Sequence, residues 1–230
     1  LSDLANQLRQ AVTKAVATGD GSTLMTQAEG IYEQVTQILN SKDANGNYLY
    51  GGDKNGQPPL TVSSLSDLTS LSSASDAFQN GTIANSVMVG DGQSIQVGML
   101  ASDVGGSLMQ TLKEVADFAA GPDGTFTDSL TDTQSSFLTG EITSATTAAT
   151  QVNNAAAANG NVYSQLQDAS ANQKTMSTLF SGFVSNIEDV DMPTAITQLN
   201  QNQVALQAAL QVTAQLNQVS LLNYLPAPSG

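Results

Sequence analysis

Only a few residues of this 230-residue chain have the types and spacing that chemistry requires. The closest carboxylates are the pair Glu29 and Glu33 and the group Glu188, Asp189 and Asp191. Two facing carboxylates can serve as acid and base in glycoside hydrolysis. Neither set lies in a segment that is expected to form a pocket, and the chain has no Cys or His to act as nucleophile or base. We therefore expect a non-enzymatic protein.

The segment 43–47, Asp-Ala-Asn-Gly-Asn, begins like a calcium-binding loop. However, Gly46 comes too early for such a loop, and Lys54 stands where the bidentate glutamate should be. A solvated turn is the better interpretation, here and at 90–92 and 122–124. The absence of Cys and His also excludes thiolate and imidazole ligands for a metal. We expect neither a metal nor another cofactor.

The composition narrows the classes of partner. The net charge of −14 and the isoelectric point near 4.1 create a field that repels phosphate backbones, so we expect no nucleic-acid binding. No segment has the roughly 18 uninterrupted apolar residues of a membrane span, and none has the form of a signal peptide. The chain opens at Leu1 already in helical rhythm, so we expect it to be a fragment of a longer protein.

Apolar residues recur at helical spacing in four segments, which predicts amphipathic helices. These segments are 1–17, 22–40, 102–119 and 132–188. We expect Ser22 or Thr23 to cap the second helix, and Ser102 or Asp103 the third, because their oxygens can accept from free backbone N–H groups. The fourth helix would be roughly 80 Å long at 1.5 Å per residue. Such a rod needs the other three helices laid antiparallel along it.

The long helix has one apolar stripe that should face these partners. The stripe consists of Leu138, Ile142, Ala145, Ala149, Val152, Ala156, Tyr163, Leu166, Ala169, Met176, Phe180, Phe183 and Ile187. Gly160 lies inside the pattern, where it should weaken the helix locally or let another helix approach closely.

Residues 43–101 differ in their sequence pattern from the helical segments around them. Asn-Gly pairs at 45–46, 55–56 and 80–81 alternate with short apolar runs. Because Asn and Gly both tolerate positive φ, this pattern predicts β-hairpins and turns. One short helix is possible near 72–79.

The C-terminal segment has an unusual composition, with no charged residue from Thr194 to Leu225. Pro193 suits the first turn of a helix here. Its apolar residues form two stripes, and the rest is Gln, Asn and Thr. An ordinary surface helix, which remains the alternative, would carry Lys and Glu opposite its stripe. An assembly interface explains the amides better, because neighbouring amides can satisfy a buried Gln while a buried charge is costly. The predicted interface residues are Ile196, Leu199, Leu206, Leu210, Val212, Leu216, Val219, Leu222 and Leu225.

Short motifs gather toward the C-terminal end of the chain. They are Gly160–Leu166, Ser185–Met192, Ala195–Leu199, Leu206–Leu210 and Ser220–Leu225, with Asn47–Gly52, Pro58-Pro59 and Val89–Gly92 further upstream. Together they resemble the flagellin and flagellar hook-associated protein 3 superfamily. The resemblance covers most of 1–225 and is most specific in 160–225.

The resemblance implies a structural subunit of the bacterial flagellum, exported through the flagellar secretion channel without a cleaved signal peptide and assembled outside the cell. Its implied partners are further copies of itself, hook-associated proteins and flagellin, with an export chaperone as a candidate. Members of the family pair their terminal helices as a coiled coil. This chain lacks the family's N-terminal helix, so its C-terminal helix should have no partner within the chain.

The expected fold is mainly α (α+β). It comprises a helical rod formed by 1–42 and 102–190, a β-hairpin region at 43–101, a coiled-coil-type assembly helix at 191–225 and a tail at 226–230. The ending Ser220–Leu225 favours the hook–filament junction protein, hook-associated protein 3, with filament flagellin as the alternative. A carbohydrate-binding adhesin is a second alternative, although only 5% of the residues are aromatic and could stack on sugars.

Overall fold

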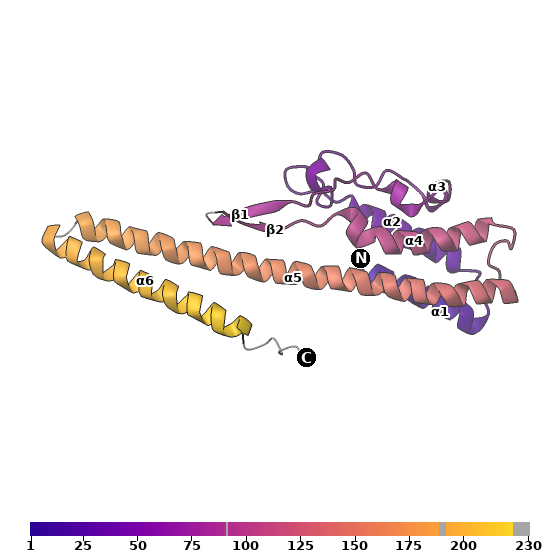
Figure 1. Ribbon diagram of the computed structural model, residues 1–230. Helices are drawn as coiled ribbons and strands as arrows, with labels where there is room; N and C mark the ends of the chain where they lie inside the picture. Colours follow the sequence, from indigo (N-terminus) through magenta and orange to yellow (C-terminus); the bar gives the residue numbers. More distant parts are fainter. Residues whose placement is uncertain (91, 189–191, 223–230) are drawn as a thin grey trace. The chain divides into compact units, whose positions relative to one another are not determined.

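The computed structural model describes the backbone of residues 1–90, 92–188 and 192–222 and the side chains of 1–90, 92–185 and 196–216. The fold is mainly helical with one two-stranded antiparallel sheet, as the sequence predicts. In chain order the elements are α1 (Ser2–Thr18), α2 (Leu24–Leu39), η1 (Gly52–Lys54), α3 (Leu65–Thr69), η2 (Ala74–Ala77), β1 (Ser86–Gly90), β2 (Gln93–Gln96), α4 (Ala101–Ala120), α5 (Asp132–Glu188) and α6 (Met192–Leu222) (Figure 1). The chain divides into two compact units, 1–169 and 170–230, and α5 runs from the first into the second.

One apolar core holds the first unit together. It is formed by the buried stripes of α1, α2 and α4 and by the first turns of α5. α2 packs against α1, α3 and α4. The backbone of α4 comes close to α2 at Gly105, where an added Cβ would lie 2.6 Å from Cδ1 of Leu39. The four predicted helices therefore exist, and their bounds lie within about two residues of the prediction.

Two helices lie along the start of α5, as Figure 1 shows. The hydroxyl of Ser2 in α1 donates to the side chain of Asn153, and the hydroxyl of Ser107 in α4 donates to that of Gln151. The predicted bounds of α5, 132–188, are confirmed. Burial of its stripe is confirmed only for part of its length, because no described side chain of α5 beyond Val152 is buried.

The prediction that partner helices cover the whole stripe was therefore wrong for its second half. Tyr163, Met176 and Phe180 are exposed. The reason is length: helices of 17 and 20 residues, about 25–30 Å each, cannot cover a helix of 57. No other helix approaches Gly160, since nothing lies within 4 Å of an added Cβ, and α5 continues through it.

The region 43–101 contains one hairpin rather than several. β1 pairs with β2 in antiparallel register, Val87 opposite Ile95, with an irregularity between Met88 and Gly90. The predicted turn at Asn45-Gly46 is present, but it closes only the isolated bridge between Lys42 and Tyr48. The short helix expected near 72–79 is η2, and α3 was not predicted. Ser64 caps α3 by accepting from Asp67 N, so the Ser-x-x-Asp pattern was the signal that could have revealed it.

The predicted caps of α2 and α4 were wrong. Thr23 stands before α2 but makes no side-chain capping bond, and Leu100 occupies that position before α4. The Ser102 hydroxyl instead accepts from the side-chain amide of Asn80, whose carbonyl accepts from Ser102 N. The hydrogen bonds of Ser102 therefore connect two segments that are distant in the sequence, and they do not cap α4.

Three predicted features lie wholly or partly outside the residues that the structure describes. Asp91 in the turn at 90–92, the acidic group at 189–191 and the tail at 226–230 lie outside the described residues. The C-terminal helix begins at Met192, so Pro193 stands in its first turn as predicted.

Candidate assembly surface

The most unusual surface of the second unit is that of α6. Leu, Gln and Ala dominate this helix of 31 residues, and all three are good helix formers. From Ile196 to Leu216 every side chain is exposed. A large apolar surface without charges normally marks a site of interaction.

The predicted interface residues that are described all lie on this exposed surface. Their exposed fractions run from 39% at Leu199 to 64% at Leu216. The described members are Ile196, Leu199, Leu206, Leu210, Val212 and Leu216. The side chains of Val219 and Leu222 and the whole of Leu225 lie outside the described residues.

The helix brings these residues together as two groups. At about 100° per residue, Ile196, Leu199, Leu206 and Leu210 fall on one side. Val212 and Leu216 fall on nearly the opposite side, so their spacing excludes a single apolar face. A helix that is apolar on two sides is typical of a position between several neighbours, whereas a surface helix has one stripe. α6 can therefore make contacts in two directions.

The end of α5 adds exposed apolar residues, of which Met176 and Phe180 belong to the predicted stripe, whereas Leu179 and Val184 were not predicted. In the second unit Met176, Leu179, Phe180 and Val184 are exposed. The rings of Phe180 and Phe183 contact each other edge to face, with centroids 6.5 Å apart. The signal that could have identified this surface is the length of α5, because helices of 17 and 20 residues cannot cover one of 57.

A groove of about 460 Å³ lies between α5 and α6 in this unit. Its lining is Thr175, Thr178, Leu179, Gly182, Phe183 and Asn202. Lys174 is the one charged residue from 170 to 187 of the sequence. Hydroxyl, amide and apolar groups without carboxylates suit packing against another protein surface better than they suit catalysis.

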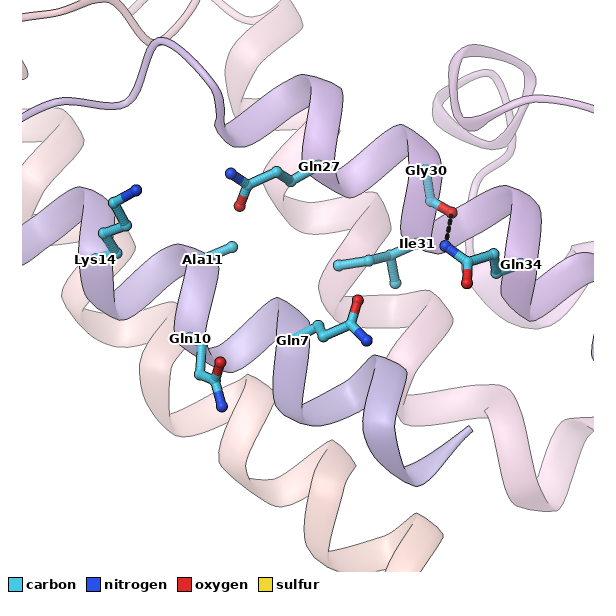
Figure 2. A pocket seen from close by; sticks show the side chains of 8 residues that line it. All are labelled: Gln7, Gln10, Ala11, Lys14, Gln27, Gly30, Ile31 and Gln34. Atoms are coloured by element: carbon cyan, nitrogen blue, oxygen red, sulfur yellow. Dashed lines mark hydrogen bonds between the residues drawn. The ribbon is translucent and has the colours of Figure 1, made fainter.

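A second groove, of about 410 Å³, lies in the first unit between α1 and α2 (Figure 2). Figure 2 shows the glutamines of both helices and Lys14 around its rim, with Ala11 and Ile31 between them. The side-chain amide of Gln34 donates to the carbonyl oxygen of Gly30 at 3.0 Å. Its lining contains no carboxylate, hydroxyl or thiol, and Lys14 is its one ionisable side chain, so it offers hydrogen bonds and no acid–base pair.

The candidates for metal and acid–base chemistry have other roles. Asp43 Oδ1 accepts from the backbone N–H groups of Asn47 and Asn45, at 2.9 and 2.8 Å, which makes 43–47 an Asx-type turn. These hydrogen bonds, that from Asn47 first, lower the pKa of Asp43. Glu29 and Glu33 point into solvent from α2. Within the described ranges no cluster of three or more Asp, Glu, His or Cys could hold a metal ion.

None of the described helices combines the length and hydropathy needed to cross a membrane. The molecule is thus a helical protein with a small hairpin and a long uncharged C-terminal helix that carries exposed apolar residues on two sides. An exposed apolar surface of this kind, free of charges, is typical of a surface that packs against another protein.

Comparison with known proteins finds a matching family model and similar solved structures. Residues 142–225 match the family model described as the bacterial flagellin C-terminal helical region. The fold is similar to that of a Vibrio parahaemolyticus protein assigned as a flagellar hook-associated protein. That match has a TM-score of 0.53 and 15% identity over 77% of this chain and 78% of the other. Bacillus cereus FlgL matches 77% of this chain and 87% of its own at 15% identity and a TM-score of 0.48. No curated protein matches the chain.

The predicted resemblance to the flagellin and flagellar hook-associated protein superfamily is confirmed, and the family model supports it directly over residues 142–225.

Proposed function

We propose that this chain is a structural, non-enzymatic subunit of the bacterial flagellum of the hook-associated protein 3 type. It joins hook to filament by self-assembly through its C-terminal helix. The observation that carries the proposal is the exposure of uncharged apolar side chains on two sides of α6. The likeness of the fold to the Vibrio protein assigned as hook-associated supports the junction type.

The proposed division of labour follows the elements. Residues 1–42 and 102–190 form the rod, 43–101 the hairpin region and 191–225 the assembly helix. The partners are other copies of the chain, hook-associated proteins and flagellin, with an export chaperone as a further candidate. The place of action is outside the cell, after export through the flagellar channel.

The physical argument rests on desolvation. Leu206 and Leu210 are 49% and 62% exposed in the single chain, so burial by neighbours would remove apolar area from water at about 25 cal/mol per Å². The amides between them can bond to amides of a neighbour. Because α6 carries no charge among its described residues, no ion has to be desolvated in this packing.

The test is complementation with the full-length protein in cells that lack this subunit. We expect Leu206→Asp/Leu210→Asp to abolish filament growth, because two carboxylates would be buried without partners. The matched control Leu206→Met/Leu210→Met keeps apolar volume and should restore growth. Far-UV circular dichroism of both variants should match the parent chain, since both positions are exposed in the monomer. Equal growth with the Asp and Met variants would refute an interface at these residues.

Filament flagellin is the alternative function. The match of residues 142–225 to the flagellin C-terminal helical region supports this alternative. Expression in two strains, one lacking the junction protein and one lacking flagellin, separates them. Rescue of the junction defect alone supports the hook-associated type, and rescue of the filament alone supports flagellin.

No observation favours a carbohydrate-binding adhesin. In 43–100 the aromatic rings are half-buried, and Lys42 Nζ already lies 4.5 Å from the centre of the Tyr48 ring. A sugar that stacked there would have to displace this cation.

A further inference from the structure

Two glutamates meet where α4 packs on α5. The helices run antiparallel, and the rings of Phe118 and Phe137 stack across the interface with centroids 4.0 Å apart. One turn earlier on α4 is Glu114, and one turn later on α5 is Glu141, so the two carboxyls face each other. The negative charge of Glu114 lies close enough to act on the Glu141 carboxyl.

Glu141 is unusually placed for an acid. The residue is only 8% exposed, and its Oε2 has no hydrogen-bond partner. The Ser144 hydroxyl, one turn along α5, lowers the pKa of Glu141, but by less than burial and the charge of Glu114 raise it. Glu114 is half-buried, and its Oε1 accepts from the side-chain amide of Gln110 at 2.8 Å. A buried acid of this kind normally has a cation beside it.

No counter-charge reaches the pair from the helices around it. Between Asp132 and Asp168, α5 carries no charged residue except Glu141. On α4, Lys113 is bound to Asp117 and to the carbonyl of Thr69. α1 carries Asp3, Arg9 and Lys14, and neither of its cations forms an ion pair within the described part of the chain.

Two ionised carboxylates that face each other in a buried contact repel, and neither can donate a hydrogen bond to the other, because both can only accept. A single proton between them solves this, as it donates from one carboxyl to the other and removes one of two repelling charges. We propose that Glu114 and Glu141 form a proton-binding pair that makes the contact between α4 and α5 sensitive to pH near neutrality. The structure thus assigns a ligand, the proton, to a site that the proposed assembly function does not use.

The electrostatics agree with this geometry. Burial first, and the charge of Glu114 second, raise the pKa of Glu141 to about 7 from an ordinary value of 4.5. A carboxyl with a raised pKa binds its proton more tightly in the folded chain than in the unfolded chain. Its contribution to stability is therefore fully present below about pH 4.5 and is lost as the pH rises to about 7.

The direct measurement is carbon-13 NMR of the glutamate carboxyls in the full chain as the pH is raised. We expect one glutamate to titrate near pH 7, apart from the others, and its signal to be absent in Glu141→Gln. In Glu114→Gln the midpoint of Glu141 should fall without reaching its ordinary value, because burial is the larger cause. Titration of all glutamates together below pH 5 would overturn the proposal.

Denaturant unfolding between pH 5 and 8 gives an independent readout. Between pH 5 and 8 the unfolding constant of the parent chain should rise by on the order of 50- to 100-fold more than that of Glu141→Gln, because the pKa of Glu141 is 4.5 in the unfolded chain and about 7 in the folded chain. Asp168→Asn changes an exposed carboxylate of the same helix and should follow the parent chain. Parallel curves for the parent chain and Glu141→Gln would contradict proton binding.

A divalent metal cation is the competing ligand for the same two carboxyls. Repeating the NMR titration with millimolar Mg²⁺ or Ca²⁺ distinguishes the two ligands. A midpoint unchanged by either cation supports the proton, while a downward shift of the Glu141 midpoint would overturn the assignment in favour of a cation.

Discussion

The two halves of α5 have the same apolar rhythm and opposite surroundings. From Leu138 to Val152 the stripe lies in the core, covered by α1 and α4. Beyond Val152 the same rhythm continues through Tyr163 to Phe180 with no described side chain buried. The comparison teaches that a stripe at helical spacing predicts a helix, whereas its burial depends on whether another element is long enough to reach it.

Helices α4 and α6 show the same contrast between covered and uncovered apolar residues. Both helices are rich in Leu, Val and Ala, but the apolar side of α4 faces α2 and α5, while α6 presents its apolar residues to solvent. α4 holds the first unit together. α6 retains apolar surface that the chain by itself leaves uncovered, which is the physical basis of the proposed assembly.

The prediction with the largest expected effect compares the same substitution at one leucine in α4 and at one leucine in α6. Leu112 in α4 is fully buried, so Leu112→Ala should lower the free energy of unfolding by about 2–5 kcal/mol, through lost transfer energy and a new cavity. Leu210→Ala in α6 should change it by less than about 0.5 kcal/mol, because Leu210 is 62% exposed. Urea unfolding of the monomer at low concentration measures both, and similar losses would abolish the distinction between the helices.

A second prediction concerns the closeness of packing in the first unit. In Gly105→Ala the new methyl would lie 2.6 Å from Cδ1 of Leu39, which is itself fully buried and cannot move freely. We expect a loss of about 1–3 kcal/mol in stability from this overpacking. The neighbour Gly106 has nothing within 4 Å of an added Cβ, so Gly106→Ala is the control and should be neutral or slightly stabilising. If thermal unfolding gives the same stability for both variants and for the parent chain, α2 and α4 can move apart at Gly105 without a loss of stability.

The smallest expected effect lies in the uncovered half of α5. Gly160→Ala should stabilise the helix locally by about 0.5–1 kcal/mol, because alanine loses less backbone entropy and its Cβ meets nothing within 4 Å. Slower amide hydrogen exchange around 155–165, with the global unfolding midpoint nearly unchanged, is the expected result. Faster exchange there would mean that Gly160 has a close neighbour after all.

The irregular region 43–101 shows why local signals were only partly sufficient. Asn45-Gly46 forms its turn because Gly46 adopts φ of 85°, but a turn does not decide whether strands follow it. The predicted hydroxyl caps failed because Ser102 pairs with Asn80, 22 residues away. In the same way, both side-chain groups of Asn40 bond to the backbone of Leu60. Hydrogen bonds between distant segments leave no periodic trace in the sequence.

What the sequence determined by itself is the periodic and compositional part of this protein. Residue spacing predicted α5 to its last residue, and the lack of charge after Thr194 singled out α6 as the surface that we propose for assembly. Only the tertiary structure decided where burial stops along α5, and which side chains meet across helices, such as Glu114 and Glu141. The reason is physical: helix formation follows from neighbours within one turn, while burial and the pairing of charges depend on how helices of different length lie against each other.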